Sequence, residues 1–309
     1  MNIIRKFQAI ILAKNEAKPL SVERCGTLYL CATPIGNLGD MTFRAVDTLR
    51  SVGLIAAEDT RHSRKLTSHF DIHVPLTSYH EHNRQTKGPE LVAKLLTGID
   101  IALVSDAGLP GISDPGEGLV QLAIEAGVRV VPIPGANAAL TALVASGLAT
   151  DEFLFIGFLP KATAARRAKI RSLQNFAVSL LFYESPHQLL KTLADLLAVL
   201  GNRRAVIGRE LTKLHEEFRR GQLTELIEWF KENKPRGEFS LVVEGVTSPP
   251  LSESAAMVEM SEELSDGAIL QVVNRLISAG VNKKDAIKMT ASQLDLPRRR
   301  VYQLVVKGD

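Results

Sequence analysis

The chain alternates regularly between apolar runs of strand length and amphipathic segments of helix length, and this alternation constrains its fold more than any other feature. The pattern is typical of a layered α/β protein whose sheet is largely parallel. In the first half, we expect strands at 27–32, 54–57, 74–78, 101–105 and 128–133, and helices at 42–52, 89–96, 116–126 and 137–146.

The α/β pattern resumes in the second half and then gives way to helices. We expect strands at 153–158, 179–183, 204–208 and 239–243, and helices at 186–200 and 224–231. Three short helical patterns follow, at 268–279, 283–292 and 297–307, and predict a small unit of helix-turn-helix type. The predicted organisation is an N-terminal extension (1–25), an N-terminal α/β domain (26–149), a C-terminal α/β domain (150–247), an acidic linker (248–267) and a basic helical domain (268–309).

The cysteine content and the hydropathy of the chain indicate the cellular compartment in which the protein is expected. The 309 residues include two cysteines, Cys25 and Cys31, which make neither a disulfide framework nor a zinc site, so we expect a reducing compartment. No run approaches the roughly 20 apolar residues of a membrane span. We therefore expect a cytoplasmic protein with no membrane segment.

The net charge of +3 is small, but the basic residues are segregated. Residues 274–309 hold eight Lys or Arg against three Asp, and a second basic run without acids occupies 161–171. Either run alone is equally explained by a solvated helix face. Two separate runs favour a polyanionic partner.

Three loops rich in Gly, Pro and small residues follow predicted strands. They are TPIGNLGD (33–40), SDAGLPGISDPG (105–116) and PIPGANAALTAL (132–143). The first is not the GxGxxG of a dinucleotide-binding turn. Open α/β sheets bind ligands at the carboxyl ends of their strands, and small residues let the backbone approach a flat ligand closely. The three loops together therefore predict a cofactor cleft.

These loops resemble the S-adenosylmethionine-binding loops of the tetrapyrrole methylase superfamily. The motifs ATPIGNLGD, AAEDTRHSRKL, SDAGLPGISDPG, PGANA, FYESPH and GEFSLVVEG occur in the order typical of its ribosomal RNA branch, the small-subunit (16S) ribosomal RNA 2′-O-ribose methyltransferases. The resemblance covers about 26–246, and the C-terminal helices are similar to the helical domain appended in that branch. It implies a tetrapyrrole-methylase-like fold of two α/β domains with the cofactor cleft between them.

The resemblance also implies the cofactor, the acceptor and the contacts. The cofactor is S-adenosyl-L-methionine, and the acceptor is a cytidine ribose in the decoding region of 16S ribosomal RNA within the 30S ribosomal subunit. Members of the superfamily commonly form homodimers. Porphyrin-methylating relatives usually have GxGPG, GDP and Tyr-Met where this chain has ATPIG, SDA and Tyr-Glu. The implied cofactor contacts are Pro34, Gly36, Val104, Ser105, Asp106, Leu109, Asn137, Ala138, Glu184 and Leu211.

Methylation of a ribose hydroxyl needs a group that takes its proton. Glu58 or Asp59, at the end of a predicted strand, could accept the proton, and Arg61 could hold a phosphate through two hydrogen bonds. A structural alternative stays open, in which Asp59 or Thr60 caps the next helix and Glu58 forms a salt bridge.

Two further polar segments are open to more than one interpretation. His80 and His82 could contact RNA, bind a metal or lie in a surface loop, and the sequence supplies no further metal ligands, so no metal is predicted. Ser185 suits an N-cap before Pro186, which leaves Glu184 at the strand end unexplained.

RNA affinity is expected from the basic segments, because phosphate contacts supply much of the binding free energy. An aromatic content of 5% argues against a broad platform for stacking single strands. Two rival functions remain, a methylase of a small tetrapyrrole-like acceptor and a non-catalytic ribosome-assembly or RNA-binding factor. The candidate RNA contacts are Arg166, Arg167, Lys283, Lys284, Arg298, Arg299 and Arg300.

Overall fold

The structure is a computed structural model that describes residues 25–246, 266–278, 281–294 and 296–307. These fall in two compact units, 1–246 and 247–309. The predicted N-terminal extension lies outside the described residues except for Cys25, and the predicted acidic linker lies outside them except for its last two positions. None of the helices in the described ranges has the length and apolarity needed to cross a membrane.

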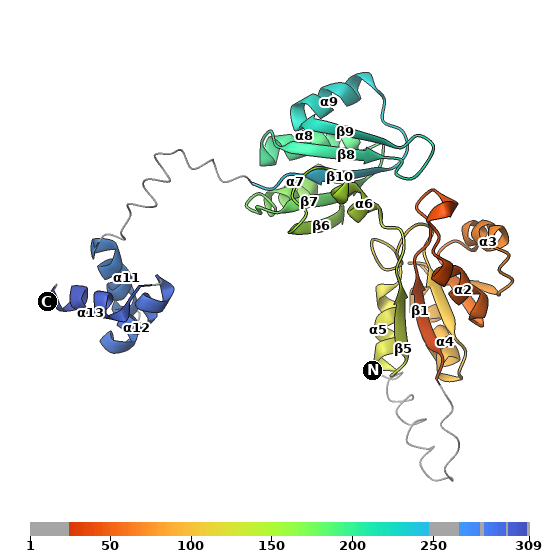
Figure 1. The fold of residues 1–309 in the computed structure, drawn as a ribbon, viewed down its shortest axis with the longest axis horizontal. Helices are drawn as coiled ribbons and strands as arrows, with labels where there is room; N and C mark the ends of the chain where they lie inside the picture. The colour runs from red at the N-terminus through yellow and green to blue at the C-terminus, as the bar shows by residue number, and fades with distance from the viewer. Residues whose placement is uncertain (1–24, 247–265, 279–280, 295, 308–309) are drawn as a thin grey trace, which may run out of the picture. The chain divides into compact units, whose positions relative to one another are not determined.

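The first sheet is wholly parallel, and its strands have the order β3-β2-β4-β1-β5. Its neighbouring strands β1 and β5 lie side by side in Figure 1. The alternation of side chains along each strand divides its apolar residues between two cores. Ile55 and Val104 face α2, whereas Leu28 and Leu103 face α4 and α5. The strands are β1 (Thr27–Cys31), β2 (Leu54–Ala57), β3 (Leu76–Ser78), β4 (Ile101–Val104) and β5 (Arg129–Ile133), and the helices are α2 (Phe43–Ser51), α3 (Thr60–His69), α4 (Arg84–Leu96) and α5 (Glu117–Glu125), with a short 3-10 helix, η1 (Leu38–Asp40).

The second sheet is mixed, with the order β6-β7-β10-β8-β9. β6 and β7 are parallel, whereas β10 runs antiparallel to both β7 and β8, and β8 and β9 form an antiparallel pair. The strands are β6 (Phe153–Phe158), β7 (Ser179–Glu184), β8 (Arg204–Arg209), β9 (Glu217–Gln222) and β10 (Phe239–Val243). Helices α7 (Thr163–Arg171), α8 (Leu189–Leu200) and α9 (Leu223–Glu232) form a core with one face of this sheet.

α6 (Ala138–Val144) packs on the other face of the second sheet, although it follows β5 of the first sheet in the chain. Asn137 caps this helix by accepting a hydrogen bond from the Leu140 N–H at 3.0 Å. The Ala139 N–H donates to the Tyr183 hydroxyl of β7 at 3.2 Å, which ties the start of α6 to the second sheet. The two sheets are thus joined by a loop whose last residue is a helix cap.

The C-terminal unit consists of α11 (Asp266–Ser278), α12 (Lys283–Gln293) and α13 (Arg298–Lys307), which share one small core. The predicted fold class, two α/β sheets followed by a helical unit, is confirmed. The predicted elements need correction in several places. β9, α3 and α7 are absent from the predicted strands and helices, α4 begins five residues before Pro89, and α8 begins at Leu189 rather than at residue 186.

Candidate active site

A cleft of about 480 Å³ lies between the carboxyl ends of the first sheet and the second sheet. One wall comes from the loops after β1, β2, β4 and β5, and the other comes from the ends of β6, β7 and β10 and the loop after β8. Its lining residues are Ile35, Glu58, Asp106, Ala107, Gly108, Leu109, Ile112, Ser113, Asp114, Asn137, Ala138, Phe158, Tyr183, Glu184, Ser185, Pro186, Leu211, Glu238, Phe239 and Ser240.

Backbone hydrogen bonds hold the loops of the first wall together. Thr33 and Gly108 exchange two of them, at 2.8 and 3.0 Å, and the Thr33 hydroxyl donates to the Ser105 carbonyl at 3.2 Å. Gly108 has a φ of +81°, and its Cα faces Ile35 closely enough that a Cβ would lie 3.4 Å from Ile35 Cγ2. The left-handed backbone favours a glycine there, whereas a Cβ would make only an ordinary van der Waals contact with Ile35.

The cleft is strongly anionic. Five carboxylates line it, those of Glu58, Asp106, Asp114, Glu184 and Glu238, and no lysine, arginine or histidine is among its described lining residues. One of the five is compensated from outside the lining, because Lys213 pairs with Glu238 at 2.8 Å. A cationic ligand would compensate these charges, because unpaired charges are costly to bury.

Two of these carboxylates have perturbed protonation. Burial raises the pKa of Glu58, and the neighbouring charge of Asp106 adds to the effect. Burial, followed by the charge of Glu58, raises the pKa of Asp114 from 3.8 to about 6. Like charges that share a partly desolvated site disfavour ionisation, so the charge of Glu58 helps to raise the pKa of Asp114.

Asp114 was not among the sequence candidates. It lies near the end of the loop SDAGLPGISDPG, where Asp-Pro-Gly is equally explained by a turn. The available signal was the presence of two aspartates, Asp106 and Asp114, in one loop after a buried strand.

Of the three catalytic candidates, only Glu58 lines the cleft. Asp59 caps α3 by accepting from the Arg61 N–H at 2.8 Å, and its carboxylate pairs with the Arg61 guanidinium at 2.8 Å. The Arg61 side chain is 88% exposed and holds the pKa of Asp59 well below its usual range. The capping alternative therefore describes Asp59, whereas Glu58 forms none of the salt bridges found among the described residues.

His80 adjoins this site, since its charge acts on the pKa of Glu58. Its Nδ1 and the Oε2 of Glu58 are both buried, and neither has a hydrogen-bond partner in the described part of the chain. His82 is exposed, with its ring 6.1 Å from that of His80. Within the described ranges, no group of three or more His, Cys, Asp or Glu could hold a metal ion.

The structure brings most of the predicted cofactor contacts to the cleft. Val104 and Ser105 are buried beneath it, and Pro34 and Gly36 flank the lining residue Ile35. Gly36 lies against the loop after β8, where any added Cβ would collide with the Lys213 side chain. The predicted contacts that line the cleft are Asp106, Leu109, Asn137, Ala138, Glu184 and Leu211.

Glu184 is a buried acid at the end of β7. Its carboxylate accepts from the Ser185 N–H at 2.7 Å and from the Thr192 hydroxyl of α8 at 2.6 Å. The Ser185 hydroxyl also donates toward Glu184, at 3.4 Å, instead of capping the helix. Neutral donors thus stabilise Glu184, which explains an acid at this position without a salt bridge.

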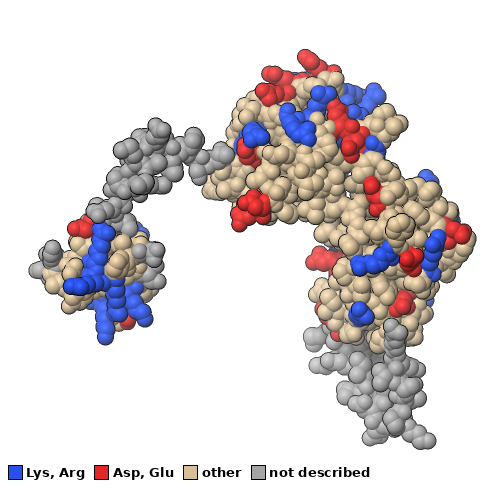
Figure 2. Space-filling model, viewed as in Figure 1, with Lys and Arg blue, Asp and Glu red and all other residues tan. Residues whose placement is uncertain are grey.

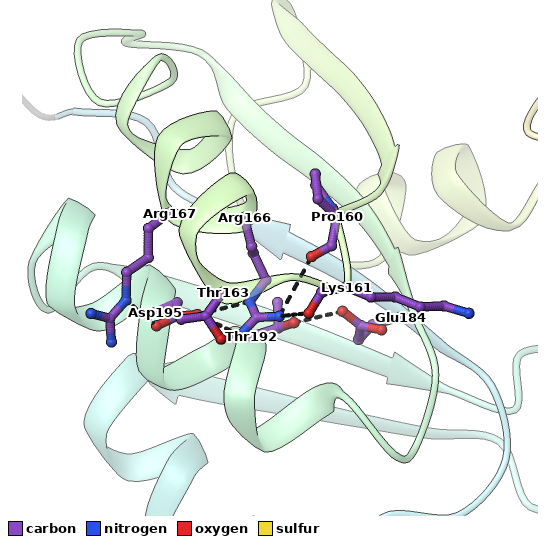
Figure 3. A network of polar contacts seen from close by, with 8 residues as sticks. All are labelled: Pro160, Lys161, Thr163, Arg166, Arg167, Glu184, Thr192 and Asp195. Atoms are coloured by element: carbon purple, nitrogen blue, oxygen red, sulfur yellow. Dashed lines mark hydrogen bonds and ion pairs between the residues drawn. The ribbon is translucent and has the colours of Figure 1, made fainter.

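The predicted RNA contact Arg166 requires correction, because its side chain is internal. Arg166 is 2% exposed, its guanidinium pairs with Asp195 of α8 at 2.7 Å, and it donates to the Lys161 carbonyl at 2.9 Å (Figure 3). Arg167 binds the other oxygen of Asp195 at 2.6 Å but remains half exposed. A buried, ion-paired guanidinium is unavailable to a phosphate, so only Arg167 of the two stays a candidate.

The candidates in the C-terminal unit are placed differently. Lys283, Lys284, Arg298 and Arg299 are exposed, and Arg300 is partly buried. Figure 2 shows basic side chains gathered on this unit. Exposed cations suit phosphate binding, which stays a prediction for these residues.

Comparison with known proteins identifies the family. The sequence profile of the tetrapyrrole (corrin/porphyrin) methylases matches residues 27–227. The chain belongs to the tetrapyrrole methylase family. It is 50% identical over 279 residues to the ribosomal RNA small subunit methyltransferase I of Halalkalibacterium halodurans, covering 90% of this chain and 94% of the relative. It is 47% identical to the protein of the same name from Bacillus subtilis, covering 90% and 93%.

Solved structures of the tetrapyrrole methylase fold resemble the chain at low sequence identity. A cobalt precorrin-4 methyltransferase has a TM-score of 0.56 at 14% identity, covering 74% of this chain and 98% of that one. Diphthine synthase has a TM-score of 0.56 at 14% identity, covering 72% and 91%. These likenesses concern the fold. Membership of the family makes the chain a methyltransferase.

Proposed function

We propose that this methyltransferase transfers a methyl group from S-adenosyl-L-methionine to the ribose 2′-oxygen of a cytidine in the decoding region of 16S ribosomal RNA. The observation that carries the proposal is the 50% identity, over 90% of the chain, to a relative named for small-subunit ribosomal RNA methylation. The choice of ribose, cytidine and decoding region rests on the resemblance of the loop motifs. A cytoplasmic homodimer is part of the same proposal.

The cleft suits this cofactor electrostatically. S-adenosylmethionine carries a sulfonium and an ammonium group against a single carboxylate and is thus a net cation, and the described lining offers five carboxylates with no basic residue among them. The buried Oε2 of Glu58 has no hydrogen-bond partner among the described residues. A buried carboxylate oxygen normally accepts a hydrogen bond or contacts a cation, and a bound ligand could supply either. Asp106, Leu109, Asn137, Ala138 and Leu211 would hold the cofactor, which supplies an activated methyl group.

The protein must then orient the hydroxyl and take its proton. A carboxylate of the cleft would take the proton of the ribose hydroxyl, and the bound cofactor would supply the methyl group that the oxygen accepts, with the sulfur leaving as a neutral thioether. We assign proton acceptance to the Glu58–Asp114 pair. A general base is most effective when its pKa lies near the working pH, and the pKa of Asp114 is about 6.

The anionic lining disfavours the tetrapyrrole alternative. Natural tetrapyrroles carry several carboxylates, which would be enclosed with five more in the cleft. An RNA chain can keep its phosphates outside and insert one ribose. Arg61, at the exposed start of α3, is available to such a phosphate if it exchanges Asp59 for the ligand.

The deciding experiment is methyl transfer from labelled S-adenosylmethionine to 30S subunits and to naked 16S RNA from cells lacking this gene, followed by mapping of the labelled nucleotide. We expect label on one ribose 2′-oxygen. Label on a base, or on no RNA, would overturn the proposal. Wild-type turnover in both Glu58→Ala and Arg61→Ala would overturn only their assignment to the acceptor site.

Cofactor titration separates the enzyme from a non-catalytic assembly factor. An active cleft should bind S-adenosylmethionine with a Kd in the micromolar range or tighter, about −8 kcal/mol or better. Deleting residues 255–309 should weaken RNA binding at low salt and leave cofactor binding nearly unchanged. Unchanged RNA affinity would remove the helical unit from RNA recognition.

A further inference from the structure

The helical unit has a hollow of its own between α12 and α13, with a volume of about 680 Å³. α12 contributes Lys283, Lys284 and Ile287, and α13 contributes Arg298, Arg299, Tyr302 and Val306. The i, i+4 spacing of 298, 302 and 306 places these three residues on one face of α13. The adjacent face, with Val301 and Val305, is buried in the core of the unit.

The side chains of Tyr302 and Val306 do not pack in that core. Tyr302 is 57% exposed and Val306 is 54% exposed, whereas the core is built without either of them. Each of the other three tyrosines, all within the described ranges, is at least partly buried. An open aromatic ring beside an apolar floor, here the buried Ile287, is a feature of binding surfaces rather than of packing.

The charges around this ring select the ligand. Four cations and no acid are found among the described residues that line the hollow, so an anionic ligand is favoured. A nucleotide combines a flat π-face with phosphates on either side, and bases stack on aromatic side chains while lysines and arginines bind the backbone. An acidic peptide would satisfy the cations but would leave the open tyrosine ring without a planar partner.

We infer that this hollow binds one unstacked nucleotide of a single-stranded RNA segment, with the base against Tyr302 and the flanking phosphates on Arg298, Arg299 and Lys284. The inference rests on the proposed function, since it assumes an RNA substrate. It adds a second recognition point, in the C-terminal unit, separate from the ribose that enters the cleft. A single stacking position also agrees with a chain that has few aromatic residues.

The test uses the full-length protein and three labelled probes: a mixed-sequence RNA hexamer, a blunt-ended RNA duplex long enough to remain paired, and a heparin fragment that carries charge without bases. Tyr302→Ala should weaken hexamer binding about tenfold or more. The same variant should change duplex and heparin binding less than twofold. Tyr302→Phe, which keeps the ring, should bind the hexamer as the wild type does.

A matched control variant and a second readout distinguish loss of the nucleotide contact from a folding defect. Met289→Ala removes an exposed apolar side chain of α12 outside the hollow and should bind all three probes normally. Tyr302→Trp should show fluorescence quenching with the hexamer and not with heparin. Arg298→Gln should make the negative slope of log association constant against log salt concentration shallower by about 0.7 for the hexamer, because one phosphate contact is lost.

Wild-type hexamer affinity in Tyr302→Ala would overturn the inference. So would an equal loss for all three probes, which would indicate an electrostatic surface only, or no measurable hexamer binding by the wild type. Methyl transfer to 16S RNA distinguishes this failure from failure of the proposed function. A wild type that labels RNA while Tyr302→Ala binds the hexamer normally refutes only the nucleotide site.

Discussion

The α/β unit contains a buried acid that is paired with cations, Asp195, and two acids in the cleft that are not, Glu58 and Asp114. Comparing them distinguishes a structural role from a functional one. Asp195 is buried between α7 and α8 and is held by two guanidinium groups, at 2.7 and 2.6 Å. Burial opposes its ionisation, but hydrogen bonds from Arg167 and Arg166 outweigh burial and hold the pKa of Asp195 below its usual range. Neither Glu58 nor Asp114 pairs with a lysine or arginine in the part of the chain that the structure describes, and their pKa values are raised.

The difference teaches that the fold pairs the buried carboxylate on which its own packing depends, whereas two acids of the ligand site, Glu58 and Asp114, form no salt bridge within the described ranges. A buried pair that loses one partner destabilises the protein strongly. Perturbed acids in a cleft, in contrast, are candidates for catalysis. Substitutions in the two groups should therefore have opposite effects on stability and activity.

The largest effect should come from Asp114→Asn. Loss of the proton acceptor should lower kcat by about 10²–10⁴-fold, while the Kd for S-adenosylmethionine changes little. Single-turnover methyl transfer and calorimetric cofactor titration measure the two quantities. Asp47→Asn, on the exposed face of α2, is the matched control and should retain wild-type turnover. Turnover within twofold of wild type in Asp114→Asn would leave Glu58 as the base.

Asp195→Ala should cause the largest loss of stability. It leaves the Arg166 guanidinium buried without a counter-charge, at a cost of about 3–5 kcal/mol in the free energy of unfolding. Urea denaturation measures this value, with Asp47→Ala as the control. Replacing the pair together, as Arg166→Met with Asp195→Leu, should recover most of the loss. A cost below about 1 kcal/mol for Asp195→Ala would contradict the comparison, because it would show that water reaches Arg166.

The two acids should also respond oppositely to pH. The pKa of Asp114 is raised in the folded state, so its contribution to stability is present below about pH 4 and is lost as the pH rises through about 6. The pKa of Asp195 is lowered, so its contribution is present above the unfolded value and is lost on acidification. Asp114→Asn should therefore stabilise the protein above pH 7, by on the order of 1 kcal/mol after allowance for its partial exposure.

Thermal melts of wild type and Asp114→Asn between pH 4 and pH 8 measure this difference. The gain in Tm should grow between pH 4 and pH 7 and then level off. A gain that is constant across the range would show that Asp114 titrates normally and would remove the electrostatic argument for its role.

The smallest effect is expected for Arg167→Ala. This guanidinium is half exposed, and Asp195 keeps Arg166 after the substitution, so the free energy of unfolding should fall by about 1 kcal/mol or less. Urea denaturation beside Asp195→Ala gives the comparison directly. A loss as large as that of Asp195→Ala would mean that Arg167, and not Arg166, carries the buried pair.

Much of the architecture was predictable because local patterns specify it. The predicted strands at 54–57, 153–158 and 239–243 match β2, β6 and β10 residue for residue. β9 was missed because Glu-Phe-Arg-Arg-Gly-Gln is a charged edge strand that pairs only with β8, and edge strands lack the apolar alternation of buried ones.

The candidate site was predictable only in part. The loops after β1, β4 and β5 were singled out from their glycines, prolines and small residues, and all three contribute to the lining of the cleft. Asp114 had only a weak signal in the sequence, as the second aspartate of its loop, and the burial of Arg166 had none. Arg166 and Arg167 are neighbours in a run of basic residues, and only the packing of α8 against α7 decides which of them is buried.

The sequence by itself determined the elements and their class, because hydrophobic periodicity and turn chemistry act over a few residues. Its loop motifs also indicated the family, because each motif is a short, contiguous run of residues. Tertiary structure alone decided which acids share a cleft, which arginine is neutralised inside the protein, and that Tyr302 faces a hollow ringed by cations. The physical reason is that desolvation and charge coupling depend on groups that are distant along the chain and meet only when it folds.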